Sequence, residues 1–228
     1  MSLARTHAIH SKCASTVSGY ETALAYVGNN IDSQRNDAHM GNTLYYLPGY
    51  GGELRTGLGE ELVRRGFHIE GRETIGEFSG LPFQMQIDIV AEDLTERFWH
   101  ADARVVANSF GAYLFLHAQT MLEPYPGKVL LLSPILGAFA EPGMGKRFLP
   151  PRRKRLMQLA ESGEMPMPTR CEAHVGADDW QSNPTAVARF CNLTGTPAFI
   201  VENEGHMLDK THVARILDVW LEEPWEGL

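Results

Sequence analysis

The sequence predicts an α/β protein with a mostly parallel, twisted sheet and helices on both faces. Short apolar runs alternate along the chain with longer segments whose apolar residues recur at helical spacing. The short runs are continuously apolar rather than alternating, which is typical of strands buried on both faces of a parallel sheet. A repeated strand-then-helix order connects parallel strands through right-handed crossovers.

Each expected element follows from this alternation. Six strands are expected at 43–49, 67–71, 104–108, 128–134, 171–176 and 197–203. Helices are expected between or after them at 53–66, 85–100, 109–122, 184–193 and 211–223. Earlier in the chain, residues 21–28 are expected to form an antiparallel edge strand and residues 29–42 a polar loop.

The chain is long enough to bury a substantial core, and its simplest organisation is one domain spanning 1–228. One segment, 137–168, interrupts the alternation with several Gly and Pro residues and a basic run. It is expected to contain one helix, at 152–162. Two interpretations stand: a small lid over the carboxyl ends of the strands, where ligands bind in such sheets, or a crossover helix with a long approach.

Composition limits the partners and the compartment. A formal net charge of -8 argues against nucleic acid and favours small molecules or proteins. The cysteines, Cys13, Cys171 and Cys191, lie far apart without CxxC spacing, as expected of reduced thiols in a cytoplasmic protein. No apolar window is long enough for a signal peptide or a membrane span, so no membrane insertion is expected.

A serine stands at the corner between the run 104–108 and the helix that follows it. Ser109 has small neighbours two residues away on each side, Ala107 and Gly111. A sharp strand-to-helix turn needs small residues there, because the strand end and the helix start nearly touch. Such a turn exposes the hydroxyl above the sheet edge, at a helix N-terminus that favours negative charge. The alternative is an ordinary N-cap serine.

This corner resembles the nucleophile elbow of the α/β-hydrolase family, G-x-S-x-G, with Ala107 in place of the first glycine. The resemblance implies a catalytic Ser109, an acid and a histidine in that chain order, each on a loop after a later strand. Asp179 matches the acid of the family's G-x-x-D pattern, with Asp178 as its competitor, and His206 resembles the G-H base. Taken singly, the aspartate could instead form a turn or cap a helix, and the histidine could be an ordinary surface-loop residue.

The glycine-rich stretch L-P-G-Y-G-G, residues 47–52, resembles the family's H-G-x loop, with Pro48 where histidine is usual. By resemblance, the backbone N–H groups of Tyr50 and Phe110 would form the oxyanion hole. Gly51 is an alternate donor. The plain interpretation is a glycine turn that leads into a helix.

The resemblance implies a serine hydrolase, without a cofactor or metal, that cleaves an ester or thioester of a small or medium acyl group. The same triad also performs amide, peptide and carbon–carbon bond hydrolysis, and the fold can serve as a non-catalytic binding module. A small-molecule acyl substrate is therefore the expected partner. The histidines and cysteine near the start of the chain, His7, His10, Cys13 and His39, match no zinc spacing.

Apolar residues outside the sheet and crossover helices are the expected cover for an acyl chain. Phe148 and Leu149, within the possible lid, are the substrate-binding candidates together with Trp180 beside the acid, which either lines the acyl pocket or caps its loop. The wider apolar set in the lid segment is Phe139, Met144, Phe148, Leu149, Met157 and Leu159. The basic run 146–155 would suit the phosphates of a coenzyme A thioester, or it forms a solvated helix face.

Overall fold

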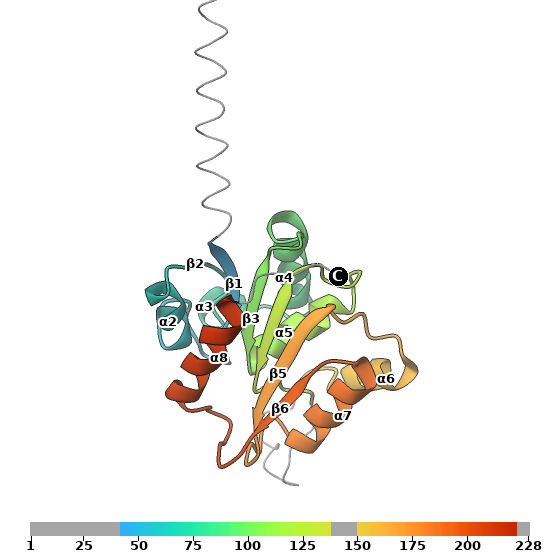
Figure 1. Ribbon diagram of the computed structural model, residues 1–228. Helices are drawn as coiled ribbons and strands as arrows, with labels where there is room; N and C mark the ends of the chain where they lie inside the picture. Colours follow the sequence, from blue (N-terminus) through green and yellow to red (C-terminus); the bar gives the residue numbers. More distant parts are fainter. Residues whose placement is uncertain (1–41, 138–149, 223–228) are drawn as a thin grey trace, which may run out of the picture. The chain divides into compact units, whose positions relative to one another are not determined.

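The computed structural model describes residues 42–137 and 150–222 (Figure 1). The expected edge strand at 21–28 and nearly all of the expected loop at 29–42 lie outside these residues. Phe148 and Leu149 also lie outside them. These expectations, and the single-domain organisation of the whole chain, stay predictions.

The six strands that the sequence predicted form one sheet in the order β2-β1-β3-β4-β5-β6 (Figure 1). Their bounds are β1 Thr43–Leu47, β2 His68–Gly71, β3 Arg104–Asn108, β4 Lys128–Leu132, β5 Arg170–Gly176 and β6 Ala198–Val201. Every neighbouring pair runs parallel. The predicted α/β class is therefore confirmed.

Seven helices lie within the described residues. They are α2 Leu58–Arg64, α3 Gly76–Gly80, α4 Phe83–Arg97, α5 Phe110–Gln119, α6 Arg155–Ser162, α7 Pro184–Thr194 and α8 Lys210–Glu222. Six of them fall where helices were expected, with shifted ends. The exception is α3, a single turn of five residues that is too short to carry a readable helical period.

The prediction of a helix over 53–66 was wrong at its start. Gly57, with φ of 54°, has the left-handed backbone that precedes α2. The chain before Gly57 folds back against the start of the helix. This close approach is visible at Gly59, where an added Cβ would lie 1.9 Å from the carbonyl oxygen of Leu54. The helix therefore begins at Leu58, after this turn.

Helices cover both faces of the sheet and bury two apolar cores. The larger core joins one face to α4, α5, α6 and α7 through residues such as Val105, Leu131, Leu94 and Phe190. The other joins the opposite face to α2 and α8 through residues such as Val106, Leu130, Leu62, Leu217 and Trp220. The central strands are thus buried on both faces, which explains their continuous apolar runs.

Two of the three cysteines lie within the described residues, Cys171 on β5 and Cys191 on α7. Both are free and buried. Burial raises the pKa of the Cys191 thiol to about 12 and that of Cys171 well above its usual value. Both thiols are therefore protonated and poorly nucleophilic at neutral pH.

His117, on α5, is only 1% exposed, and its burial predicts a loss of stability in acid. Burial lowers its pKa to about 4, and the charges of Arg152 and Arg155 act in the same direction. Below about pH 6.5 the unfolded chain binds a proton that the folded protein excludes until about pH 4. Stability is therefore complete above this window and falls as the pH drops through it.

We expect His117 to make the free energy of unfolding fall by about 1.4 kcal/mol per pH unit between pH 6 and 4.5. Urea unfolding at several pH values would measure this slope. His117→Leu should remove the part of this pH dependence that His117 causes. The control, His68→Gln, alters a side chain that is 47% exposed and should retain it. Equal slopes in wild type and His117→Leu would contradict the prediction.

Candidate active site

The predicted site residues meet at the carboxyl edge of the sheet. Because all six strands are parallel, the loops that follow them emerge at the same edge. Ser109 comes directly after β3, Asp179 follows β5 by three residues, and His206 follows β6 by five. Three segments far apart in the sequence thus deliver these side chains to one place.

Ser109 occupies a strained corner between β3 and α5. Its φ of 53° and ψ of -112° lie in a backbone region that residues other than glycine rarely adopt. Its side chain makes no capping hydrogen bond to α5, so the ordinary N-cap interpretation does not apply. Instead, Oγ lies 2.7 Å from Nε2 of His206.

Close backbone contacts hold this corner in place. A Cβ added to Gly111 would lie 2.1 Å from the carbonyl oxygen of Leu47, so only glycine lets α5 approach the end of β1. The amide of Ser109 donates to the carbonyl of Leu132 at 2.8 Å and ties the corner to β4. The sequence predicted a small residue at position 111, and the close approach of β1 explains why it is glycine.

His206 bridges the serine and a carboxylate. Its Nδ1 lies 2.9 Å from Oδ2 and 3.0 Å from Oδ1 of Asp179, while Nε2 faces Ser109. The His206 side chain is 12% exposed. It is therefore a mostly buried ring held between two partners rather than a free surface-loop histidine.

The two neighbouring aspartates have different environments. Asp179 is 1% exposed, and its Oδ1 also accepts hydrogen bonds from the amides of Gln181 and Ser182 at 2.9 and 2.8 Å. Asp178 is exposed, and the helix that follows is capped by Asn183. Asp179 therefore forms a turn and faces His206 as well, whereas Asp178 points to solvent.

The loops that carry the acid and the histidine are joined at Gly176. A Cβ at this position would lie 2.2 Å from the carbonyl oxygen of Glu204 and 2.4 Å from that of Gly205. The amide of Asp178 donates to the Glu204 carbonyl at 2.9 Å. The His206 loop therefore crosses directly over the end of β5.

The glycine-rich loop after β1 lies against the serine. A Cβ on Gly49 would be 3.3 Å from Cβ of Ser109. The alternate oxyanion donor, Gly51, already donates its amide to the carbonyl of Thr74 at 3.2 Å. Tyr50, between these two glycines, is 73% exposed, and its ring meets the Phe110 ring edge-to-face, 5.9 Å between centroids.

Thr74, which the sequence did not single out, shapes this loop. It is 2% exposed, its hydroxyl donates to the Gly49 carbonyl, and the Gly52 amide donates to the same hydroxyl at 2.9 Å. The Thr74 amide in turn donates to the Gly52 carbonyl at 3.0 Å. Nothing in the stretch R-E-T-I marks this role, because the partners are brought together only by the β1–β2 pairing.

Solved structures resemble this arrangement over most of the chain. The ydeN gene product of B. subtilis has a TM-score of 0.57 at 13% identity, covering 80% of this chain and 100% of its own. An α/β-hydrolase enzyme from the sediment metagenome of the Mar Chica lagoon, Morocco, has a TM-score of 0.55 at 14% identity, covering 79% and 90%. The chain has the α/β-hydrolase fold.

A third solved structure, the monoacylglycerol lipase of Paleococcus ferrophilus, has a TM-score of 0.53 at 14% identity and covers 78% of this chain and 93% of its own. No protein-family model and no curated protein sequence matches this chain. At these identities the likeness shows the α/β-hydrolase fold, and the chemistry rests on the site itself.

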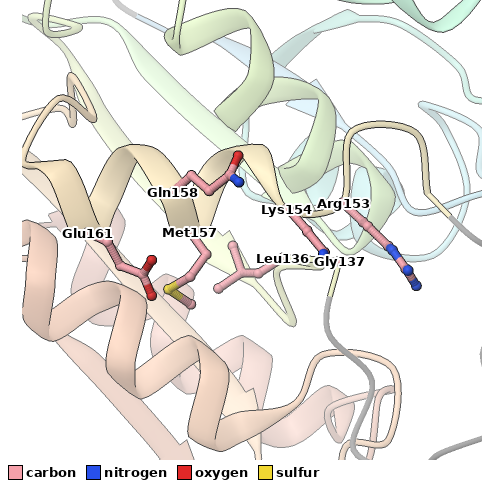
Figure 2. A pocket seen from close by; sticks show the side chains of 7 residues that line it. All are labelled: Leu136, Gly137, Arg153, Lys154, Met157, Gln158 and Glu161. Atoms are coloured by element: carbon pink, nitrogen blue, oxygen red, sulfur yellow. The ribbon is translucent and has the colours of Figure 1, made fainter.

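In this α/β-hydrolase fold, the segment between β4 and β5 contains a pocket of about 400 Å³ (Figure 2). Leu136 and Met157 are its apolar members, and the Arg153 side chain extends away from Met157 (Figure 2). The full lining is Leu136, Gly137, Arg153, Lys154, Met157, Gln158 and Glu161. Met157, from the expected acyl-cover set, thus lines a pocket in this segment.

Leu159, from the same set, instead lies in the larger core. With Leu156 and Ala160 it buries one side of α6 in that core, where α6 contacts α7, and it is 5% exposed. This packing favours the crossover interpretation for residues 155–162. Trp180, 37% exposed beside Asp179, is the one substrate-binding candidate that the structure describes. The lid interpretation of 137–168 stays a prediction.

No group of three or more His, Cys, Asp or Glu side chains within 42–137 and 150–222 is arranged to hold a metal ion. Across those same ranges, no helix has both the length and the apolar character needed to cross a membrane.

Proposed function

We propose that this protein is a serine hydrolase that cleaves an ester or thioester of a small or medium acyl group. The observation that carries the proposal is the continuous contact from Ser109 Oγ to His206 Nε2 at 2.7 Å and from His206 Nδ1 to Asp179 at 2.9 Å. A serine hydroxyl is a weak nucleophile, and this order of partners is the arrangement that activates it.

In the proposed mechanism, Ser109 Oγ attacks the acyl carbonyl while Nε2 of His206 takes the hydroxyl proton. The Asp179 carboxylate accepts the Nδ1–H, which holds the ring in the tautomer whose Nε2 is unprotonated and stabilises the imidazolium. His206 then returns the proton to the departing alkoxide or thiolate. Water, deprotonated by the same nitrogen, then attacks the acyl carbonyl, and His206 passes that proton to Ser109 Oγ as the bond between Oγ and the acyl carbon breaks and the carboxylic acid leaves.

The oxyanion of the tetrahedral intermediate needs N–H donors close to Ser109. We propose the amides of Phe110 and Tyr50 for this role. Phe110 is the first residue of α5, whose N-terminus favours negative charge, and the contact of Gly49 with Ser109 brings the Tyr50 loop to the same side.

The strain at Ser109 supports a functional role. A non-glycine residue in this backbone region costs on the order of 1–3 kcal/mol, and such strain collects at active sites where it aims a side chain. A purely structural N-cap would be served by an unstrained serine that bonds its own helix. The names of similar structures, a monoacylglycerol lipase and an esterase, support ester over amide hydrolysis.

Reaction with a fluorophosphonate probe tests the proposal, because an activated serine displaces fluoride from the probe and becomes phosphonylated, whereas an ordinary serine does not. We expect one probe per chain, mapped by peptide mass spectrometry to the peptide that contains Ser109. Heat-denatured protein is the control and should remain unlabelled. Absence of labelling in the folded protein would favour the non-catalytic binding module instead.

The acyl group is tested with nitrophenyl esters of increasing chain length, acyl-coenzyme A thioesters and a nitroanilide. We expect turnover of short and medium esters, with the anilide much slower. Faster turnover of the anilide would replace the ester proposal by an amidase.

A further inference from the structure

Ser133, the residue directly after β4, is hydrogen-bonded to the loop that carries His206 and to the loop that carries Asp179. It is 1% exposed, and its φ of 44° lies in the left-handed region that favours glycine. Its strand neighbours β3 and β5, the strands that lead to Ser109 and Asp179. Serine here accepts a backbone conformation that glycine would adopt without strain, so its hydroxyl is the feature that needs an explanation.

The polar groups of Ser133 connect three separate segments. Its hydroxyl donates to the carbonyl of His206 at 2.9 Å. Its own carbonyl accepts the hydroxyl of Ser182 at 2.5 Å, and its amide donates to the carbonyl of His174 on β5 at 2.7 Å. One residue therefore contacts the histidine itself and the loop that carries the acid.

Ser182 extends this connection to the carboxylate. It is fully buried, and its amide donates to Oδ1 of Asp179 at 2.8 Å. Its side chain thus holds Ser133 while its backbone holds the acid. A path of hydrogen bonds leads from the His206 carbonyl through Ser133 and Ser182 to the Asp179 carboxylate, in addition to the direct contact between ring and carboxylate.

We infer that Ser133 is a positioning residue that sets the place of the His206 ring relative to both Ser109 and Asp179. The inference rests on the proposed function. His206 belongs to a loop outside any helix or strand, so its ring is held by side-chain contacts and by the few anchors of its backbone. The Ser133 hydroxyl anchors the backbone carbonyl of His206. Without this hydrogen bond the His206 ring can leave its 2.7 Å contact with Ser109 Oγ.

Two variants separate the hydroxyl from the backbone. Ser133→Ala removes the hydroxyl and keeps the strain of the left-handed backbone, whereas Ser133→Gly removes both. The matched control is Ser162→Ala, because the Ser162 hydroxyl also donates to a carbonyl, that of Leu159, but on the exposed end of α6. Kinetics with a nitrophenyl ester and thermal unfolding are measured on all three.

We expect both Ser133 variants to lose about 10- to 100-fold in kcat with little change in KM, as small misplacements of catalytic groups do. Ser133→Gly should unfold at a higher temperature than Ser133→Ala and yet be no more active. Ser162→Ala should stay within about twofold of wild type in kcat. Activity that follows thermal stability across the Ser133 variants, or an unchanged kcat, would overturn the inference.

A second measurement does not depend on turnover. The proton on Nδ1 of His206 is observable by NMR, and its exchange with water reports how firmly the ring is held against Asp179. We expect exchange to be about 10-fold faster in both Ser133 variants than in wild type or Ser162→Ala. Equal exchange rates would overturn the positioning role.

This pair of measurements distinguishes the two proposals. If wild type neither hydrolyses esters nor reacts with a fluorophosphonate, the proposed function fails, and the proton exchange still decides whether Ser133 holds His206. If wild type is active and both Ser133 variants match it in kcat and in proton exchange, the inference fails alone.

Discussion

Ser109→Ala should lower kcat for ester hydrolysis by about 10⁶-fold, since loss of a triad nucleophile removes the whole covalent route. The fold should survive, because the variant removes a single oxygen and its bond to His206. Alanine in the same strained backbone should change the free energy of unfolding by no more than about 1 kcal/mol. Nitrophenyl ester kinetics and urea unfolding measure the two quantities.

Ser79→Ala is the matched control for this loss. Its hydroxyl donates to the Gly76 carbonyl on the exposed helix α3, and its removal should leave kcat unchanged. His206→Ala should be nearly as inactive as Ser109→Ala, and the double variant should be no worse than either, because the two residues act as a unit. Turnover near wild type in Ser109→Ala would exclude the proposed mechanism.

Asp179→Asn should lower kcat by about 10⁴-fold. An amide at this position presents an NH₂ group to Nδ1 of His206 and so favours the tautomer whose Nε2 carries the proton. That nitrogen can no longer accept the proton of Ser109. The volume of the side chain is unchanged, and its oxygen can still accept the amides of Gln181 and Ser182.

The neighbouring residue supplies a control of identical chemistry. Asp178→Asn makes the same replacement one position earlier, on an exposed side chain, and should alter kcat by no more than about twofold. Ester kinetics on the two variants over pH 6 to 9 provide the comparison. A larger loss in Asp178→Asn than in Asp179→Asn would show that the resting contact with His206 is not the catalytic one.

Much of the architecture could be predicted because burial on both faces leaves a direct signature in the strands. The runs around Val105 and Leu130 are continuously apolar, and they became central strands of the sheet. The limits of helices were less predictable, since they depend on contacts across the chain. α2 begins late because Gly59 packs on Leu54, a contact that no local pattern records.

The candidate site was partly accessible to sequence reasoning for a related reason. Ser109, Asp179 and His206 each follow a strand in a parallel sheet, so their positions along the chain indicated a common edge. Periodicity could not decide between Asp178 and Asp179. The two residues differ only in the direction that each takes from the turn, and this direction depends on the folded loop. Thr74 and Ser133 were not identified, since their roles arise from hydrogen bonds to backbone carbonyls of distant segments.

The crossing at Gly176 has a consequence for how the proposed hydrolase can be altered. Because the backbone of Glu204 and Gly205 lies against this glycine without room for a methyl group, residues 177–183 and 202–209 behave as one interlocked part. A loop graft that exchanges either one alone would break the match at the crossing. Redesign of the substrate preference would therefore need to transplant the two together, or leave both intact and vary the insertion between β4 and β5.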